Sequence, residues 1–382
     1  MARNVLVTGV SRYLGGRFAR TVAKQRGIGR VIGVDVVAPA HDIGKATFFR
    51  VDLRSPVEVR RLLADADIDT VVHMGVISTS PPGAGRGARA AMKEINVIGS
   101  MQMLAACQGS EQVRRLVLKS TAGVYGGSAV DPAMFTEDIE PAVPPSSGWA
   151  KDTVDVEGYA RALARRRPDL NLTVLRFANI VGPGMHTPLT DVFELPVVPV
   201  VAGFDPRIQL VHEDDAIGAT LAAVRSEASG VVNIAGDNVI ALLQMVAMAG
   251  RPPLMVPQQL TAWADRVIKR LTGVEIGAEE WSLLQYGRGL DTTRMRDMLG
   301  YECSYDTKEA FEDYLTSRQQ RGWHASDSVS YVDSALRAGF ASIGLPVPEG
   351  ASARPGSPAG PGRGHSSRPR DASRRRTKEG TS

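Results

Sequence analysis

The N-terminal segment places the strongest constraint on the fold. Asn4–Thr8 is a run of apolar and β-branched residues that predicts a buried strand, and Gly9 follows it directly. Gly9 permits a tight turn, and Gly15 lets the next helix pack closely against the strand. The exposed N–H groups at the start of such a helix bind anions. The segment therefore predicts a phosphate-binding strand–turn–helix unit.

The rest of the first half alternates short strand patterns with helical ones. Strands are predicted at Asn4–Thr8, Arg30–Asp35, Thr47–Val51, Thr70–Met74, Arg115–Ser120 and Leu172–Phe177. Helices are predicted between them at Arg17–Gln25, Val57–Asp65, Gly87–Ala106 and Trp149–Arg166. Nearly continuous apolar strands are typical of parallel sheets that are covered on both faces. The expected fold class is therefore α/β, with a Rossmann-type doubly wound parallel sheet.

Asp35 ends the second predicted strand. A carboxylate at this distance from a glycine turn accepts hydrogen bonds from an adenosine ribose and repels a 2′-phosphate, so NAD is the expected cofactor. Arg12 stands between the glycines and brings a positive charge that could bond a phosphate or narrow the site. We give Asp35 more weight because it would lie at the ribose itself. A purely structural turn is the alternative.

Composition divides the chain into three parts. Residues 1–182 are expected to form the dinucleotide-binding domain, and residues 183–345 a smaller C-terminal substrate lobe whose strands and helices return to the main sheet. Residues 350–382 are rich in Gly, Pro, Ser and Arg, which predicts a disordered basic tail. Residues 351–382 hold eight basic and two acidic side chains, a net charge of +6, which leaves −2 of the total of +4 for residues 1–350.

Several classes of protein are disfavoured by composition. The two cysteines, Cys107 and Cys303, have no spacing typical of a disulfide framework, and no metal site is expected. The longest apolar stretch, Leu195–Phe204, is interrupted by Pro199 and is too short to span a membrane. The N-terminus shows no signal pattern, so a cytoplasmic protein is expected. Nucleic acid is an unlikely partner because the tail has no aromatic residue to stack on a base.

Four segments together resemble the extended short-chain dehydrogenase/reductases, the NAD-dependent epimerases and dehydratases. They are Thr8–Gly16, Ser120–Gly126, Ser147–Lys151 and Asp291–Tyr301. The resemblance covers about residues 1–320 and implies a cofactor site. The residues implied there are Gly9, Arg12, Tyr13, Leu14, Gly15, Asp35, Asp52, Leu53, Gly75, Asn96 and Lys151. Arg12 departs from the family, which has a glycine there.

The resemblance also implies a reaction centre. Thr121 corresponds to the hydroxyl residue that bonds the substrate, and Lys151 to the lysine of the Tyr-x-x-x-Lys motif. Ser147 stands where the family has the tyrosine that exchanges the proton. Ser147 and Lys151 are four residues apart on the predicted helix, so both are expected to point at the cofactor. An aliphatic hydroxyl is too weak an acid to replace that phenol, a loss of about 10²–10⁴-fold in rate.

The substrate implied by the resemblance is a nucleotide-sugar, with a UDP-sugar 4-epimerase-like reaction. Tyr125, Asn179 and Arg207 are its implied contacts. The family also implies a homodimer through the helices at 87–106 and 149–166. Another small-molecule carbonyl substrate remains an alternative. A second hypothesis, favoured by Ser147, is a non-catalytic dinucleotide-binding protein that regulates or scaffolds.

Overall fold

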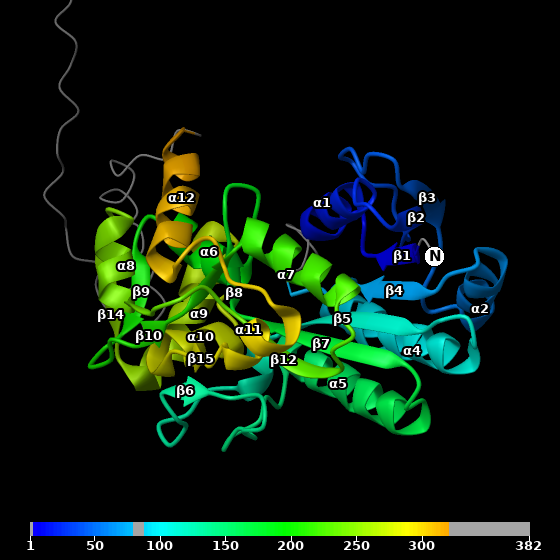
Figure 1. Cartoon of the computed structure of the whole chain (residues 1–382). Coiled ribbons are helices and arrows are strands. Elements are labelled where there is room, and N and C mark those ends of the chain that lie inside the picture. The colour runs from blue at the N-terminus through cyan, green and yellow to red at the C-terminus, as the bar shows by residue number, and fades with distance from the viewer. Residues whose placement is uncertain (1–2, 79–87, 321–382) are drawn as a thin grey trace, which may run out of the picture.

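The computed structural model describes residues 3–78 and 88–320 (Figure 1). The expected basic tail, residues 350–382, and the end of the expected lobe, residues 321–345, lie outside the described residues. No helix in the described part of the chain is long and apolar enough to cross a membrane.

A parallel sheet of seven strands forms the centre, so the expected doubly wound α/β fold is confirmed. The strand order is β12-β7-β5-β4-β1-β2-β3, and the order reverses direction at β1 and β4. All six neighbouring pairs are parallel, which brings the carboxyl ends of the strands to one edge. The strands are β1 (Arg3–Thr8), β2 (Ile28–Asp35), β3 (Thr47–Arg50), β4 (Thr70–His73), β5 (Arg115–Thr121), β7 (Asn171–Phe177) and β12 (Gly230–Ile234).

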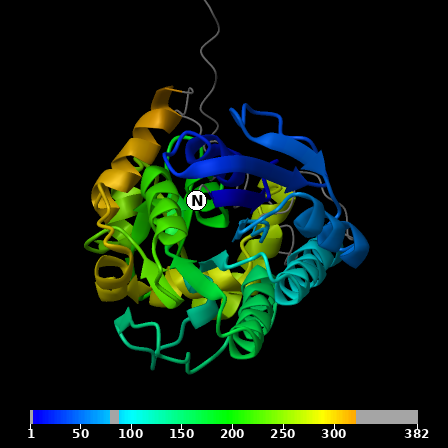
Figure 2. The same cartoon turned by 45° about the vertical axis from the view of Figure 1, so that its right-hand side comes forward.

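Helices cover both faces of this sheet (Figures 1 and 2). One face carries α1 (Tyr13–Val22), α7 (Glu213–Arg225) and α11 (Thr293–Leu299), and the other carries α2 (Pro56–Asp65), α4 (Ser100–Gly109) and α5 (Gly148–Arg166). The strand side chains alternate between the two layers. In β5, Val117 belongs to the α1 layer, whereas Leu116 and Leu118 belong to the α5 layer. This alternation sends Lys119 and Thr121 toward the α1 side at the carboxyl edge.

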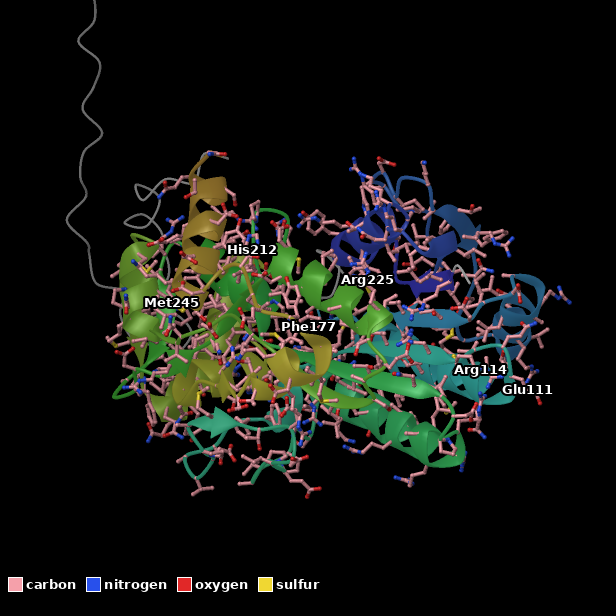
Figure 3. All side chains as sticks on the ribbon, in the orientation of Figure 1. Glu111, Arg114, Phe177, His212, Arg225 and Met245 are labelled. Carbon is pink, nitrogen blue, oxygen red and sulfur yellow. The ribbon has the colours of Figure 1, made fainter. Side chains whose placement is uncertain are left out.

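A second apolar core lies in the smaller lobe beyond that edge. Figure 3 shows Phe177, the last residue of β7, near the middle of the molecule, whereas Arg114, just before β5, lies at the far end. The lobe's elements are β6 (Met134–Phe135), β8 (Asn179–Val181), α6 (Pro188–Glu194), β9 (Val198–Val201), β10 (Arg207–Ile208), β11 (Leu210–His212), β13 (Ile240–Ala241), α8 (Leu242–Met248), β14 (Pro253–Val256), α9 (Thr261–Thr272), α10 (Ala278–Tyr286), β15 (Gly289–Leu290) and α12 (Thr307–Gln320). Short 3₁₀ helices lie at Ala122–Tyr125 and Gln258–Leu260.

The predicted helix at Gly87–Ala106 differs in detail from the structure. Its described part consists of α3 (Ala88–Lys93), a π-helical stretch at Glu94–Gly99, and α4. Helices α6, α10 and α11 were not predicted, because Pro-rich flanks and short lengths hide their periodicity. α4 and α5 pack side by side, with Tyr159 of α5 exposed. A homodimer through these helices stays a prediction.

The glycine turn after β1 tolerates no side chain at Gly15. A Cβ added there would overlap the carbonyl oxygen of Gly9, so Gly15→Ala must push α1 away from β1. We expect Gly15→Ala to lower the melting temperature by several degrees. Gly158 of α5 is the matched control, because nothing lies within 4 Å of a Cβ there. Gly158→Ala should stabilise the helix by up to about 1 kcal/mol. Equal melting temperatures of wild type and Gly15→Ala would contradict this close packing.

Candidate functional site

A cavity of about 270 Å³ lies at the carboxyl edge of the sheet, between the sheet and the lobe. It is lined by the start of α1, the ends of β4, β5 and β7, and the segment before α6. A crevice at the carboxyl ends of parallel strands, where the strand order reverses, is the usual ligand site of a doubly wound sheet. The lining includes Arg12, Tyr13, Leu14, Gly15, Lys119, Thr121, Trp149, Thr153, Phe177, Asn179 and His186.

The glycine turn is fastened to the end of β2. Asp35 accepts hydrogen bonds from the backbone N–H of Ser11 at 3.1 Å and from the Ser11 hydroxyl at 2.5 Å. Gly9 has a φ of 76°, in the left-handed region that favours glycine. The structure thus places Asp35 beside the turn that precedes α1, and its contact with a cofactor ribose stays a prediction. Arg12 is the N-cap residue of α1, and its side chain makes no capping hydrogen bond.

Two cations face the cavity without an acceptor. Neither Arg12 nor Lys119 donates a side-chain hydrogen bond to any residue that the structure describes, although Arg12 lies within electrostatic range of Asp35. Burial lowers the pKa of the Arg12 guanidinium, and the charge of Asp35 raises it. Burial, assisted by the charge of Arg12, lowers the pKa of Lys119 to about 8. The cavity therefore carries positive charge that is only partly compensated.

The start of α5 presents Trp149 and Thr153 to the cavity. Ser147 is the exposed N-cap residue of this helix, and Lys151 pairs with Asp155 on another face; neither is among the described lining residues. Residues 149 and 153 are one helical turn apart, whereas residues 149 and 151 point about 200° apart. The sequence placed Ser147 and Lys151 at the cofactor, and the structure places them away from the cavity.

Trp149 is held by a buried carboxyl group. Its indole N–H donates to Glu280 of α10 at 3.1 Å. The pKa of Glu280 is raised to about 7, chiefly by burial and then by the neighbouring charge of Glu279. A Cβ on Gly123 would lie 2.8 Å from the Trp149 ring, so the ring packs directly on the backbone that follows β5. Trp149 thus occupies the space between the cavity, the turn at Gly123 and α10.

Some of the residues expected to contact the substrate line the cavity, and others lie outside its lining. Thr121 and Asn179 line the cavity, and the Thr121 hydroxyl accepts from the N–H of Gly123 at 3.1 Å. Tyr125 is buried behind the cavity wall, where its hydroxyl donates to Asn233 at 2.8 Å. Arg207 is an exposed residue of β10 and is not among the described lining residues. Only Thr121 and Asn179 of the expected set are therefore positioned to touch a ligand in this cavity.

The remaining expected cofactor residues lie around the cavity rather than in its lining. Asn96 is buried and bonds both backbone groups of Ile77, so it fixes the segment after β4. Gly75 packs against Gly9, where an added Cβ would lie 3.0 Å from the Gly75 Cα. Asp52 follows β3 and forms an ion pair with Arg54 at 2.8 Å, and Leu53 is its half-buried neighbour. Cofactor contacts for these residues stay predictions.

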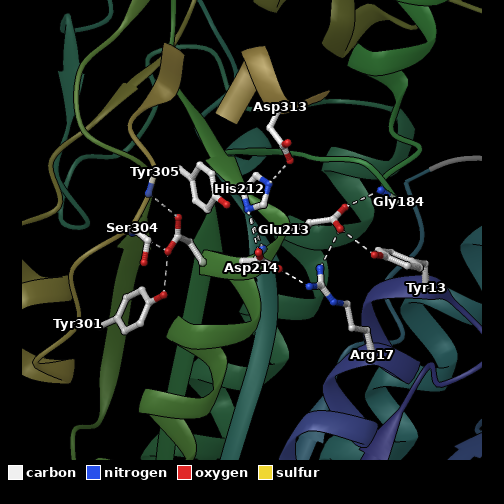
Figure 4. Close-up of polar contacts among 11 residues, drawn as sticks. Tyr13, Arg17, Gly184, His212, Glu213, Asp214, Tyr301, Ser304, Tyr305 and Asp313 are labelled. Atoms are coloured by element: carbon white, nitrogen blue, oxygen red, sulfur yellow. Dashed lines mark hydrogen bonds and ion pairs between the residues drawn. The ribbon is translucent and has the colours of Figure 1, made fainter. Parts of the chain in front are cut away.

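A cluster around Glu213 joins α1 to the lobe (Figure 4). Glu213 is buried at the start of α7 and accepts from the Tyr13 hydroxyl at 2.7 Å, from Arg17 at 2.8 Å and from the Gly184 N–H at 2.9 Å. Burial and the bond to Glu213 raise the pKa of Tyr13 to about 12. Tyr13 therefore stays a neutral donor at physiological pH and holds the segment at Gly184 over the glycine turn.

Neighbouring residues of the same helix start hold the end of the lobe. His212 lies 3.1 Å from Asp313 of α12 and stacks on Tyr305, and Asp215 accepts from the Tyr301 hydroxyl at 2.9 Å. Figure 4 shows these contacts converging from α7, α12 and the segment between α11 and α12. His212 and Asp215 thus hold α7 against α12 and against the segment that precedes it.

Among the residues that the structure describes, one group of possible metal ligands includes His186 of the cavity lining. Ligand atoms of His186, Asp191 and Glu194 lie within 4.8 Å of one another. Glu194 already pairs with Arg318 at 3.0 Å, so we assign no metal to this group.

Several site residues were missed from the sequence. Lys119 had a usable signal, because this charged residue directly follows the apolar run Leu116–Leu118 in a strand that was predicted to be covered on both faces. No sequence signal indicated Trp149, Thr153 or Glu213 as site residues, since their positions depend on helix rotation and on contacts between distant segments.

A model of the NAD dependent epimerase/dehydratase family matches residues 5–235. The chain belongs to this family. An uncharacterized protein of Mycobacterium tuberculosis (strain ATCC 25618 / H37Rv) is 46% identical over 319 residues, covering 82% of this chain and 84% of that protein. The human short-chain dehydrogenase/reductase family 42E member 1 is 31% identical over 236 residues, 58% of each protein.

Solved structures share the fold. MoeE5 in complex with UDP-glucuronic acid and NAD has a TM-score of 0.63 at 22% identity, covering 83% of this chain and 99% of that one. The UDP-glucose 4-epimerase of Thermotoga maritima with UDP-glucose has a TM-score of 0.62 at 21% identity, with the same coverage.

The lowered pKa of Lys119 predicts a pH-dependent stability. Between about pH 8 and pH 10.5 the Lys119 side chain is protonated to a greater extent in the unfolded chain than in the folded one, so the contribution of Lys119 to stability becomes more favourable as the pH rises across this window. Below pH 8 the full cost of burying the ammonium is present. Lys119→Met removes that cost and should raise the melting temperature at pH 7 by on the order of a few degrees. The gain should shrink toward pH 10.5.

Lys308→Met is the matched control for this experiment, because Lys308 is an exposed residue of α12. Melting curves at pH 7, 8, 9 and 10 compare the two variants with wild type. A gain for Lys119→Met that is constant with pH would contradict the lowered pKa.

Proposed function

We propose that this protein binds NAD at the glycine turn and acts on a nucleotide-sugar. The observation that carries this proposal is the cavity at the carboxyl edge of the sheet, which joins the start of α1 to the lobe. Its chemistry fits a dinucleotide. The start of α1 supplies N–H groups, and Arg12 and Lys119 supply positive charge for a diphosphate. Asp35, which lies outside the cavity lining beside the glycine turn, would supply an acceptor for ribose hydroxyls.

The nucleotide-sugar part of the proposal is supported by the family and by residues in the cavity. The structural neighbours include proteins solved with UDP-glucuronic acid or UDP-glucose. Thr121 and Asn179 offer a hydroxyl and an amide to the sugar side of the cavity. Bound NAD would accept a hydride from a sugar carbon or return it. The segment at Gly184, held by Glu213, would shield that carbon from water.

A specific observation favours the second candidate, a non-catalytic NAD-binding protein. The cavity face of α5 carries Trp149 and Thr153 where a tyrosine and a lysine would be needed to exchange and assist a proton. Neither an indole nor an aliphatic hydroxyl has a pKa near neutral pH, so neither serves as an effective general acid or base. This second candidate predicts weak or absent turnover together with intact NAD binding.

The position of Asp35 predicts a preference for NAD over NADP. Titration calorimetry should show tighter binding of NAD, because a 2′-phosphate would lie against the carboxylate. Asp35→Ser should reduce the preference, since serine can still bond a ribose without repelling a phosphate. Tighter binding of NADP by wild type would show that Arg12 controls the choice of cofactor.

Two variants test which pair of α5 positions can carry the tyrosine and the lysine of a Tyr-x-x-x-Lys motif. Ser147→Tyr creates Tyr-x-x-x-Lys in the sequence, but on residues outside the described cavity lining. The double variant Trp149→Tyr with Thr153→Lys creates the same spacing on the face that lines the cavity. We expect turnover of UDP-glucose and UDP-galactose to rise in the double variant, by at most about 10²–10⁴-fold, and to stay unchanged in Ser147→Tyr.

NAD binding is measured in both variants, so that loss of the cofactor is separated from loss of chemistry. Higher turnover in Ser147→Tyr, without a rise in the double variant, would show that the reaction centre lies at residues 147 and 151. Brisk turnover by wild type would mean that another group already moves the proton.

A further inference from the structure

Lys119 is a charged side chain of β5, an inner strand of the seven-stranded sheet. Leu116, Val117 and Leu118 before it are fully buried, and Lys119 follows Val117 onto the α1 side of the sheet. The side chain is half-buried and reaches the cavity. Placing an ammonium group in such a position is costly unless it is paired.

The described surroundings of Lys119 offer no anion to pair with it. Arg12 faces it from the start of α1 and repels it, and Asp35 lies beyond Arg12 at the end of β2. His73 of β4 places its ring against Ser100 of α4, on the other face of the sheet, and is neutral above about pH 4 because burial lowers its pKa. Trp149 and Thr153 from α5, and Asn179 from β8, are uncharged, and His186 lines the cavity from the segment before α6.

Two adjacent cations at the start of a helix make a site for an anion. The N–H groups of the first turn of α1 add partial positive charge to that of Arg12 and Lys119. Each cation would bond an oxygen of a ligand without displacing a side-chain partner among the described residues. A group with several negative oxygens spread over two phosphorus atoms would meet both cations at once, and a single carboxylate would not.

We propose that Lys119 binds the diphosphate of the ligand in this cavity, together with Arg12, and takes up a proton when that ligand binds. The inference rests on the proposed function for the identity of the ligand, since both NAD and a UDP-sugar contain a diphosphate. The pKa of about 8 in the free protein supports the second part, because an anion nearby raises the pKa of an ammonium. Diphosphate binding then weakens as the pH rises through 8.

The experiment is titration calorimetry of wild type, Lys119→Met, Lys119→Arg and the surface control Lys308→Met. NAD, UDP-glucose and inorganic pyrophosphate are titrated separately at pH 7, 8 and 9, in two buffers of different ionisation enthalpy. The buffer difference gives the number of protons taken up. Wild type and Lys308→Met should take up on the order of half a proton at pH 8 with the ligand that meets Lys119.

The variants at residue 119 should differ from wild type in distinct ways. Lys119→Met should bind that ligand about tenfold to a hundredfold more weakly at pH 7, as expected for a lost charge-assisted hydrogen bond, without the proton uptake. Lys119→Arg keeps the charge, so it should retain affinity and lose both the proton uptake and the weakening above pH 8. A purely structural lysine would not give this difference between the two variants.

The outcomes distinguish this inference from the proposed function. A loss confined to NAD, or to UDP-glucose, assigns Lys119 to that diphosphate. Equal affinity and equal proton uptake in wild type and Lys119→Met overturn the inference and leave NAD binding standing. Failure of wild type to bind NAD overturns the proposed function, while pyrophosphate and UDP-glucose still test Lys119. Failure to bind any of the three ligands overturns both.

Discussion

The ion pair between Arg176 of β7 and Glu157 of α5 sets the rotation of α5, and the cavity depends on that rotation. Both groups are buried, and the guanidinium bonds both carboxylate oxygens, at 3.0 and 2.6 Å. The Ser120 hydroxyl donates a further hydrogen bond to Glu157 at 2.5 Å, and the guanidinium of Arg176 donates one to the Tyr125 hydroxyl at 2.9 Å. Removing one partner of such a pair typically costs about 3–5 kcal/mol. Glu157 is one turn beyond Thr153, so fixing Glu157 against the sheet turns Thr153 and Trp149 to the cavity.

A second set of contacts places the lobe relative to the glycine turn. Glu213 receives bonds from Tyr13 and Arg17 of α1 and from the backbone of Gly184, so one buried carboxylate holds three segments that are distant in sequence. The first-turn position of Glu213 in α7 is favourable for a negative charge. Together with the pair at Glu157, it explains why a cavity of defined shape forms at the edge of the sheet.

The fold was predictable to a large extent, and the candidate site only in part. All six strands predicted between Asn4 and Phe177 are present in the parallel sheet that forms. Gly9, Arg12, Asp35, Thr121 and Asn179 were also predicted, because each stands at or near the end of a strand, where the sheet fixes its position. Ser147 and Lys151 were placed differently, because a four-residue spacing says that two residues share a helical face and not which way that face points.

The sequence by itself determined the parallel sheet and the glycine turn with Asp35. These follow from local patterns whose period and turn residues leave few alternatives. Only the tertiary structure decided that Tyr125 is buried outside the cavity lining and that Trp149 and Thr153 face the cavity. The same holds for the placement of both Arg12 and Lys119 in the cavity lining. Each of these depends on contacts between segments far apart in the chain, such as Arg176 with Glu157, and local patterns carry no information about such contacts.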